Sequence, residues 1–426
     1  MKKITLALCL LFTFILSFAQ ANQQKRIVKL WTFAEFNREE LVKRKKDINQ
    51  KFNIDLQIVM VAQNAFVQKL QAVMLDGKDA PDIIDWMIES NRILSSDPKK
   101  SFIIPLNEYV EKSNLLSEVC EGRFSWVTYG DYIYGLPHDA HPPVLMYNDS
   151  IWKKAGVDVA KIETWDEFFE ESKKLQLYKK NGKPAHYALP IGNIGLSDSM
   201  FMIWQQSGSQ ILTKDGKPNF DSPSFIEFLK KWDEWMNTGS MVIWDWGNFA
   251  QLIDNGTYAS YIAVDWWLSQ SDLAAKKGKY ELKVRSLPAY KKGMKSSASW
   301  GGSFLAIPKG TKEPEKIYDI IEYIQYEPSN LKARFLDRGM IPPLKKLWDD
   351  NLFNKNDPRF GNAKTAKIQI ESAKNIPSVV SGDYFWEFLY IFGEQYAEYF
   401  ENRTISFDQM IKNTQSTALQ RMNRRK

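Results

Sequence analysis

Cysteine is nearly absent from this chain of 426 residues, in which Cys9 and Cys120 are the two examples. Cys9 lies inside an N-terminal apolar run that follows two lysines and ends in an Ala-Gln-Ala triplet at residues 19–21. A positive start, an apolar centre and a small-residue cleavage site are typical of a secretory signal peptide, here residues 1–21. Cleavage after Ala21 would leave Cys120 without a partner for an intramolecular disulfide. We therefore expect an exported, periplasmic protein whose fold is stabilised by burial alone.

Histidine is also scarce, with three residues in the whole chain. His138 and His141 lie in a proline-containing run, and His186 lies further along the sequence. A metal centre needs several converging ligands, and a His-x-x-His pair in a proline loop lacks the helical spacing of a zinc-binding pair. We expect neither a metal nor a cofactor, and a metal or ferric-ion binder stays open as a minor alternative.

Catalytic motifs are missing as well, because the sequence contains neither a nucleophile elbow nor a zinc-protease pattern. Two acids, Asp139 and Asp265, could still form the carboxylate pair of an exported glycoside hydrolase, so an enzyme stays open as an alternative. The expected class is a protein that binds its ligand without catalysis.

No long apolar run without charges follows the leader, so no transmembrane helix is expected. The net charge of +6 falls to +4 when the leader is removed with its two lysines. Basic runs such as Lys43–Lys46 and Arg424–Lys426 are expected to form solvated surface, since no nucleic-acid-binding motif accompanies them. We predict a monomer that does not bind nucleic acid.

Aromatic residues, in contrast, are abundant, at 15 Trp, 18 Tyr and 25 Phe. Several lie beside polar residues at strand ends, and such positions are typical of ligand contacts. Others belong to amphipathic helices. In Pro223–Asn237 the apolar stripe includes Trp232 and Trp235, which we expect to pack in the core, with Gly239 as the helix stop.

Strands alternate with helices in the first part of the chain, which predicts an α/β lobe with a parallel-type sheet. The expected strands are Ile27–Phe33, Ile54–Val61 and Asp82–Trp86. Asn37 with Glu40 has the spacing of a capping box at the start of a helix. Residues 276–295 are rich in lysine and are expected to form a surface excursion.

The stretch Tyr132–Lys174 contains the most informative motifs of the chain. Its motifs are Tyr-Gly-Leu-Pro at 134–137, Leu-Met-Tyr-Asn at 145–148 and Thr-Trp-Asp-Glu at 164–167. Thr164 and Glu167 have capping-box spacing and predict the start of a helix. In this order the motifs resemble the extracellular solute-binding proteins, family 1, of ABC importers, in the carbohydrate branch that includes the maltose-binding protein.

The resemblance implies an α/β, periplasmic-binding-protein-like fold, in which two α/β lobes are joined by a multi-crossing hinge around an interlobe ligand cleft. It implies an N-terminal lobe of residues 22–137 and 298–338, and a C-terminal lobe of residues 138–297 and 339–426. Three crossings are implied, the second beside Trp300. Lobes connected in this way can close on a solute by a hinge motion.

The same resemblance places the ligand at strand ends that face the cleft. A sugar would need carboxylates or amides for its hydroxyls and flat rings for its C–H faces. The implied contacts are Glu35, Trp86, Glu89, Asp139, Asp265, Trp266, Trp267 and Trp386, and Trp300 is added for its place at the second crossing. Trp86, Asp139 and Trp266 are expected to share one wet seam between the lobes.

The implied function is the substrate-binding component of an ABC importer, which captures a sugar, oligosaccharide or polyol and delivers it to an inner-membrane permease. The first crossing, with two histidines and two prolines, departs from the maltose-binding pattern, so the sugar stays unnamed. Glycerol-phosphate or polyamine cargo also stays open. A phosphate ester would need a basic group such as Arg338 in the cleft, and a polyamine would need rings with several acids.

Overall fold

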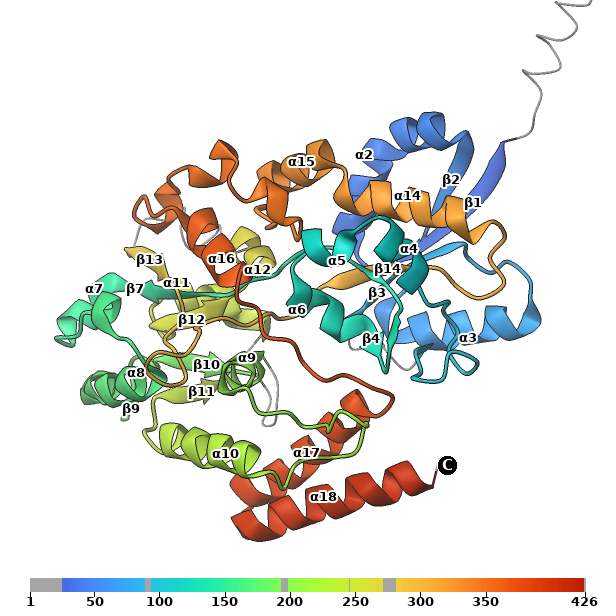
Figure 1. Ribbon diagram of the computed structural model, residues 1–426. Helices are drawn as coiled ribbons and strands as arrows, with labels where there is room; N and C mark the ends of the chain where they lie inside the picture. The colour runs from blue at the N-terminus through green and yellow to red at the C-terminus, as the bar shows by residue number, and fades with distance from the viewer. Residues whose placement is uncertain (1–24, 89–92, 193–197, 245, 271–280, 425–426) are drawn as a thin grey trace, which may run out of the picture.

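The chain folds into two α/β lobes, which lie side by side in Figure 1. The computed structural model describes residues 25–88, 93–192, 198–244, 246–270 and 281–424. The predicted signal peptide and Glu89 lie outside the described residues. Within those ranges, no helix combines the length and apolar content that a membrane crossing requires.

The first lobe is built on a five-stranded sheet with the strand order β2-β1-β3-β14-β6. β1 runs parallel to β2 and β3, whereas β14 pairs antiparallel with both β3 and β6. The predicted strands are therefore confirmed, and one strand of opposite direction, β14, lies between the parallel strands and β6, which runs in their direction. The bounds are β1 Arg26–Thr32, β2 Ile54–Met60, β3 Ile83–Met87, β6 Leu136–Pro137 and β14 Ser303–Ala306.

Helices from distant parts of the sequence cover this sheet, and α2 packs against α14 (Figure 1). The helix bounds are α2 Glu35–Phe52, α3 Phe66–Asp76, α4 Asn107–Lys112, α5 Leu115–Glu118, α6 Glu121–Phe124, α14 Pro314–Tyr326 and α15 Pro328–Arg338. The predicted capping box of Asn37 and Glu40 is wrong. α2 begins two residues earlier, and the buried Asn37 amide donates to Asp85 and Ser303 at 2.7 and 3.2 Å.

The second lobe holds an antiparallel sheet of order β12-β7-β13 and a parallel pair, β10 with β11. The bounds are β7 Val144–Asn148, β10 Leu189–Ile191, β11 Met241–Ile243, β12 Ser260–Ala263 and β13 Leu282–Arg285. β13 lies inside residues 276–295, so the predicted surface excursion is wrong there. Leu282 and Val284 are buried while Lys283 and Arg285 are half-buried, an alternation that suits a strand beside β7.

Helices make up most of the second lobe, and the C-terminal helices α17 and α18 pack together beside α10 at the bottom of Figure 1. The capping box of Thr164 and Glu167 is confirmed at the start of α8, and Trp232 and Trp235 of α10 are buried as predicted. The bounds are α7 Asp149–Lys154, α8 Trp165–Ser172, α9 Asp198–Ser207, α10 Pro223–Met236, α11 Phe249–Asp254, α12 Asp265–Gln270, α16 Thr365–Ala373, α17 Phe385–Phe400 and α18 Phe407–Asn423. Each lobe also contains one short hairpin. It is formed by β4 Thr128–Tyr129 and β5 Tyr132–Ile133 in the first lobe, and by β8 Lys179–Lys180 and β9 Lys183–Pro184 in the second.

Three crossings connect the lobes, at residues 138–143, 297–302 and 339–343. They are hydrogen-bonded to one another: the Ala140 N–H donates to the Ile341 carbonyl at 3.1 Å, and the Ser299 hydroxyl donates to the Ala140 carbonyl at 3.0 Å. The crossings therefore form one bonded unit. The lobe boundaries expected from the sequence stay a prediction.

A further segment, the C-terminal strap of residues 376–384, leaves the second lobe and lies on the first. The Val379 N–H donates to Ser125 Oγ at 3.1 Å, and the Ser381 hydroxyl donates to the Thr128 carbonyl at 3.0 Å. Asp383 accepts from the Ser96 N–H at 2.6 Å and from the Ser95 hydroxyl at 3.1 Å. The strap then enters α17, which carries one of the predicted ligand contacts.

Candidate functional site

Asp139 of the first crossing is fully buried and lies in an ion-pair network. Its carboxylate contacts His138 Nδ1 and lies 3.3 Å from Arg334 Nη1. The same guanidinium is held by Glu40 of α2 at 2.9 and 3.0 Å. Burial raises the pKa of Asp139, but the charges of His138 and Arg334 outweigh it and leave the pKa below its ordinary value. Asp139 therefore holds the first crossing against α15 and α2.

Asp265, the first residue of α12, has a similar structural role in the second lobe. Its Oδ1 lies 2.6 Å from His141 Nδ1, and its Oδ2 accepts from the Ile341 N–H at 2.8 Å. The carboxylate thus joins α12 to the first and third crossings. Because Asp139 and Asp265 are both buried and bonded within the protein, they are not positioned to flank a glycosidic bond or to meet a ligand in this conformation.

Arg123 of α6, which the sequence reasoning did not single out, is a third buried charge in the hinge. Its guanidinium donates to the Asp139 carbonyl at 3.0 Å, to Ser299 Oγ at 2.7 Å and to the Gly301 carbonyl at 3.0 Å. Burial lowers the pKa of Arg123, and the neighbouring acids oppose that effect. A Cβ added at Gly302 would overlap Arg123 Nη2, and this residue has φ +98°, so only glycine suits the position.

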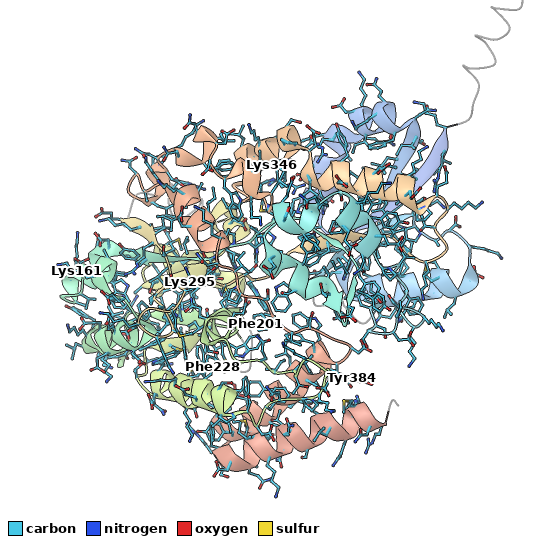
Figure 2. All side chains as sticks on the ribbon, viewed as in Figure 1. Lys161, Phe201, Phe228, Lys295, Lys346 and Tyr384 are labelled. Atoms are coloured by element: carbon cyan, nitrogen blue, oxygen red, sulfur yellow. The ribbon has the colours of Figure 1, made fainter. Side chains whose placement is uncertain are left out.

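Four aromatic rings meet between the lobes and form what we call the aromatic seam: Trp126, Phe201, Trp300 and Trp386. The ring centroid of Phe201 lies 4.9 Å from Trp300, 5.5 Å from Trp126 and 6.4 Å from Trp386. Figure 2 shows Phe201 near the middle of the molecule. Trp126 and Phe201 are buried, whereas Trp300 and Trp386 are half-buried. The structure therefore brings together two of the predicted contacts, Trp300 and Trp386, each with ring surface exposed.

Trp266 reaches the same region from α12. It is half-buried and stacks on Trp267 at 5.3 Å, and its Nε1 lies 3.5 Å from where a Cβ would stand on Gly301, beside Trp300. Trp267 is buried and packs on Phe249 at 4.5 Å. The buried ring of Trp267 thus covers one face of Trp266, and the half-buried Trp266 is the ring of this pair that can contact a ligand.

Asp198, the first residue of α9, is the acid that the sequence reasoning missed. Burial raises the pKa of Asp198 to about 6, and the neighbouring Trp300 side chain partly opposes that rise. Burial raises the pKa of Tyr261, and the nearby charge of Asp198 raises it further. An acid in the first turn of an apolar helix is ordinary in a sequence, and no pattern marked it as a binding group.

The remaining predicted contacts lie elsewhere. Trp86 is completely buried in the first lobe, where its ring packs on Phe304 at 5.7 Å and fills the space beside Gly135. Glu35 is exposed and paired with Arg38, which lowers the pKa of Glu35. The expected seam of Trp86, Asp139 and Trp266 does not form in this conformation, because the first two are sealed inside the protein. Trp266, Trp300 and Trp386 with Asp198 are the group that the structure brings together.

Metal-binding geometry is not found in the described part of the chain, where no three His, Cys, Asp or Glu side chains are grouped to hold an ion. His186, the histidine outside the hinge, lies with its Nδ1 2.7 Å from the Gly256 carbonyl. Cys120 is buried, and burial raises the pKa of its thiol to about 12.

Two α/β lobes, three hydrogen-bonded crossings and a group of half-buried rings at the hinge define the class of binding proteins that close on a solute. A family model described as bacterial extracellular solute-binding protein matches residues 43–361. The chain belongs to this family of extracellular solute-binding proteins.

Two proteins to which the chain is similar are described as arabinooligosaccharide-binding proteins. The one from Bacillus subtilis is 25% identical over 369 residues, which is 82% of this chain and 82% of that protein. The one from Halalkalibacterium halodurans is 25% identical over 347 residues, 77% of this chain and 73% of that protein. Both comparisons span most of the length of each partner.

Solved structures share the fold. The sugar-binding protein MalE of Xanthomonas citri superposes with a TM-score of 0.75 at 17% identity and covers 94% of this chain and 98% of its own. The ABC transporter associated binding protein from B. animalis subsp. lactis, in complex with beta-1,6-galactobiose, gives a TM-score of 0.70 at 21% identity over 94% of this chain and 98% of its own. The two-lobe fold expected from the sequence is confirmed.

Proposed function

We propose that this chain is the substrate-binding component of an ABC importer and that it captures a sugar or oligosaccharide between its lobes. The related arabinooligosaccharide-binding proteins support this cargo class. In this proposal the leader is removed after Ala21, the mature monomer works in the periplasm, and it delivers its cargo to an inner-membrane permease without catalysis.

The observation that carries the proposal is the group formed by Trp266, Trp300, Trp386 and Asp198. Half-buried indole rings at the hinge provide flat surfaces for the C–H faces of a sugar ring, and a mostly buried carboxylate provides an acceptor for its hydroxyls. A polar group at a fixed position orients the bound sugar. A sugar hydroxyl that misses the Asp198 carboxylate would leave a buried polar group without a hydrogen bond, which is costly.

Binding in this scheme is coupled to lobe closure. Phe201 and Trp386 of the second lobe touch Trp126 of the first, so the lobes are in contact across the aromatic seam. A solute would enter when these rings separate and would stabilise the closed arrangement by contacting both lobes. Ligand binding then shifts a population of conformations that exists without ligand.

The other cargo classes have less support from the described groups. Arg338, the basic group expected for a phosphate ester, is paired with Glu39 at 2.7 Å, and that carboxylate lies on α2. A polyamine would need several acids around the rings. Asp198 lies near Trp300, whereas the carboxylate of Asp265, beside Trp266, is already bonded to His141 and the Ile341 N–H. A neutral, hydroxyl-rich solute suits one acid and several rings.

The test is a thermal-shift screen across pentose and hexose oligosaccharides, glycerophosphodiesters and polyamines, since a tight ligand raises the melting temperature by mass action. Trp300→Ala and Trp386→Ala should each weaken binding of the best sugar by about 1 kcal/mol or more, the usual contribution of aromatic stacking. Tyr390→Ala is the matched control, because Tyr390 is an exposed ring on the same helix, α17. A shift with polyamines or phosphodiesters and none with sugars would overturn the sugar proposal.

A further inference from the structure

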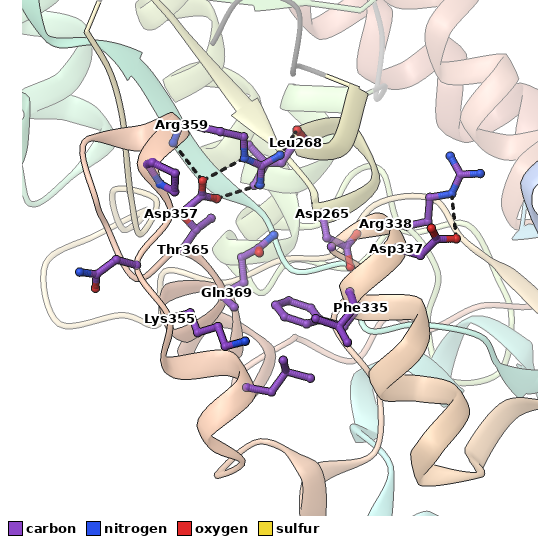
Figure 3. A pocket seen from close by; sticks show the side chains of 16 residues that line it. Asp265, Leu268, Phe335, Asp337, Arg338, Lys355, Asp357, Arg359, Thr365 and Gln369 are labelled. Carbon is purple, nitrogen blue, oxygen red and sulfur yellow. Dashed lines mark hydrogen bonds and ion pairs between the residues drawn. The ribbon is translucent and has the colours of Figure 1, made fainter. Parts of the chain in front are cut away.

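A cavity of about 350 Å³ lies beside the third crossing and outside the aromatic seam (Figure 3). Its walls come from the end of α15, from Leu268 of α12, from residues 352–359 and from the start of α16. None of the four seam rings lines it. The volume lies at the lower end of the range that small-molecule sites occupy.

Two polar side chains in the wall of this cavity are buried without hydrogen-bond partners. Gln369 Nε2 and Thr365 Oγ1 are both covered, and the residues are 3% and 4% exposed. Figure 3 shows the Gln369 amide pointing into the space between α15 and α16. A buried polar group without a partner is costly, so such atoms in a native protein call for an explanation, such as a ligand that they bind.

Several hydrogen-bond donors remain available in the cavity. Lys355 has no acidic partner within the described part of the chain, and its ammonium points toward the cavity in Figure 3. The acids in the wall are engaged: Asp357 holds Arg359 at 2.8 and 2.9 Å, and Asp265 is bonded to His141 and the Ile341 N–H. An acceptor-bearing ligand would therefore meet Lys355, Gln369 and Thr365 without displacing a protein acceptor.

The start of α16 adds a further preference for negative charge. Its N-cap residue, Lys364, makes no side-chain capping bond, and its first turn contains no acidic residue. Backbone N–H groups at an uncapped helix start attract anions, and Thr365 and Ala366 of that turn line the cavity.

We propose that this cavity binds a small carboxylate with an apolar body. The carboxylate accepts hydrogen bonds from Gln369 Nε2, Thr365 Oγ1 and Lys355 Nζ at the start of α16. The apolar body lies against Phe335, Leu268 and Leu352, which also line the cavity. A single negative charge fits better than the double charge of a phosphate, because the carboxylates of Asp265, Asp337 and Asp357 stand around the cavity.

The experiment is calorimetric titration of the mature protein with benzoate, with its neutral counterpart benzamide, and with inorganic phosphate. Benzoate is not a sugar, so the result does not depend on the function proposed for the seam. We expect benzoate to bind and benzamide and phosphate to bind at least about tenfold more weakly, the change produced by losing a charge-assisted hydrogen bond.

Variants locate the binding. Lys355→Gln and Gln369→Leu should each weaken benzoate binding by about tenfold, whereas Lys161→Gln, at an exposed lysine on the second lobe, should leave it unchanged. Circular dichroism confirms that each variant is folded. The proposal is overturned if benzoate fails to bind at millimolar concentration, if benzamide or phosphate binds as tightly, or if folded Lys355→Gln and Gln369→Leu bind benzoate like the parent protein.

Discussion

Replacing Asp198 by asparagine is expected to stabilise the ligand-free protein at neutral pH and, at the same time, to weaken solute binding. Burial raises the pKa of this acid from 3.8 to about 6. Between those values the folded chain holds a proton that the unfolded chain has released. The free energy of unfolding therefore falls as the pH rises from about 4 to about 6, and it stays lower above that window.

The magnitude follows from the size of the pKa shift. A shift of about two pH units corresponds to about 3 kcal/mol of lost stability when the carboxyl is charged, as an upper estimate for one mostly buried group. The asparagine side chain has a similar shape and would carry no charge at any of these pH values. The gain should thus approach about 3 kcal/mol near pH 7.5 and vanish near about pH 3.5.

Denaturant unfolding of Asp198→Asn and the parent protein at both pH values measures the effect, with Asp131→Asn, at an exposed acid, as the control. Titration with the best sugar should give about tenfold weaker binding for Asp198→Asn, because an amide accepts hydroxyl bonds less strongly than a carboxylate. A stability gain that is equal at both pH values would refute the assigned pKa. Unchanged sugar affinity would refute the role of Asp198 in binding.

Three further substitutions test the hinge and the strap. Arg334→Met leaves Asp139 buried without its guanidinium partner and should cost about 3–5 kcal/mol of unfolding free energy, measured in denaturant; a loss under about 1 kcal/mol would contradict the network. Gly302→Ala places a methyl group against Arg123 Nη2 and should lower the melting temperature, whereas Gly216→Ala, at a positive-φ glycine in open space, tests the backbone effect alone. Asp383→Ala removes the acceptor of the Ser96 N–H, which weakens the contact of the strap with the first lobe, and it should speed solute release in stopped-flow measurements. An unchanged release rate would show that this contact does not hold the lobes closed.

Local features could be predicted from the sequence because neighbouring residues determine them. Thr164 and Glu167 form their capping box within one helical turn, and Trp232 and Trp235 follow from the apolar stripe of α10. The capping box at Asn37 failed for the opposite reason: its amide is taken by Asp85 and Ser303, and Ser303 lies 266 residues away in the sequence. Pairing across such distances leaves no periodic signal in the chain.

The candidate site was only partly predictable for the same reason. The family resemblance pointed to Trp266 after a strand and to Trp386 at the start of a late helix, and the second crossing pointed to Trp300. The acids Asp139 and Asp265 carry the same local signal, a polar residue where a strand ends, yet the crossings bury both. Asp198 and Arg123 acquire their roles from partners on other crossings and lobes, so their own surroundings in the sequence do not distinguish them.

The buried polar bonds of the hinge also determine where it can bend. Ala140, Ser299 and Ile341 join the three crossings at fixed hydrogen bonds, so rotation at those points would break them. Gly301 and Gly339 adjoin these bonded points and have positive φ values of 72° and 70°, and a Cβ at Gly339 would meet no atom within 4 Å. The Gly301 carbonyl is itself bonded to Arg123 Nη2 at 3.0 Å, so a rotation at Gly301 would break that bond too. The backbone changes of opening are therefore expected at Gly339. Gly301, held between Trp300 and the ring of Trp266, would instead keep the spacing of these two rings of the proposed sugar site as the lobes move.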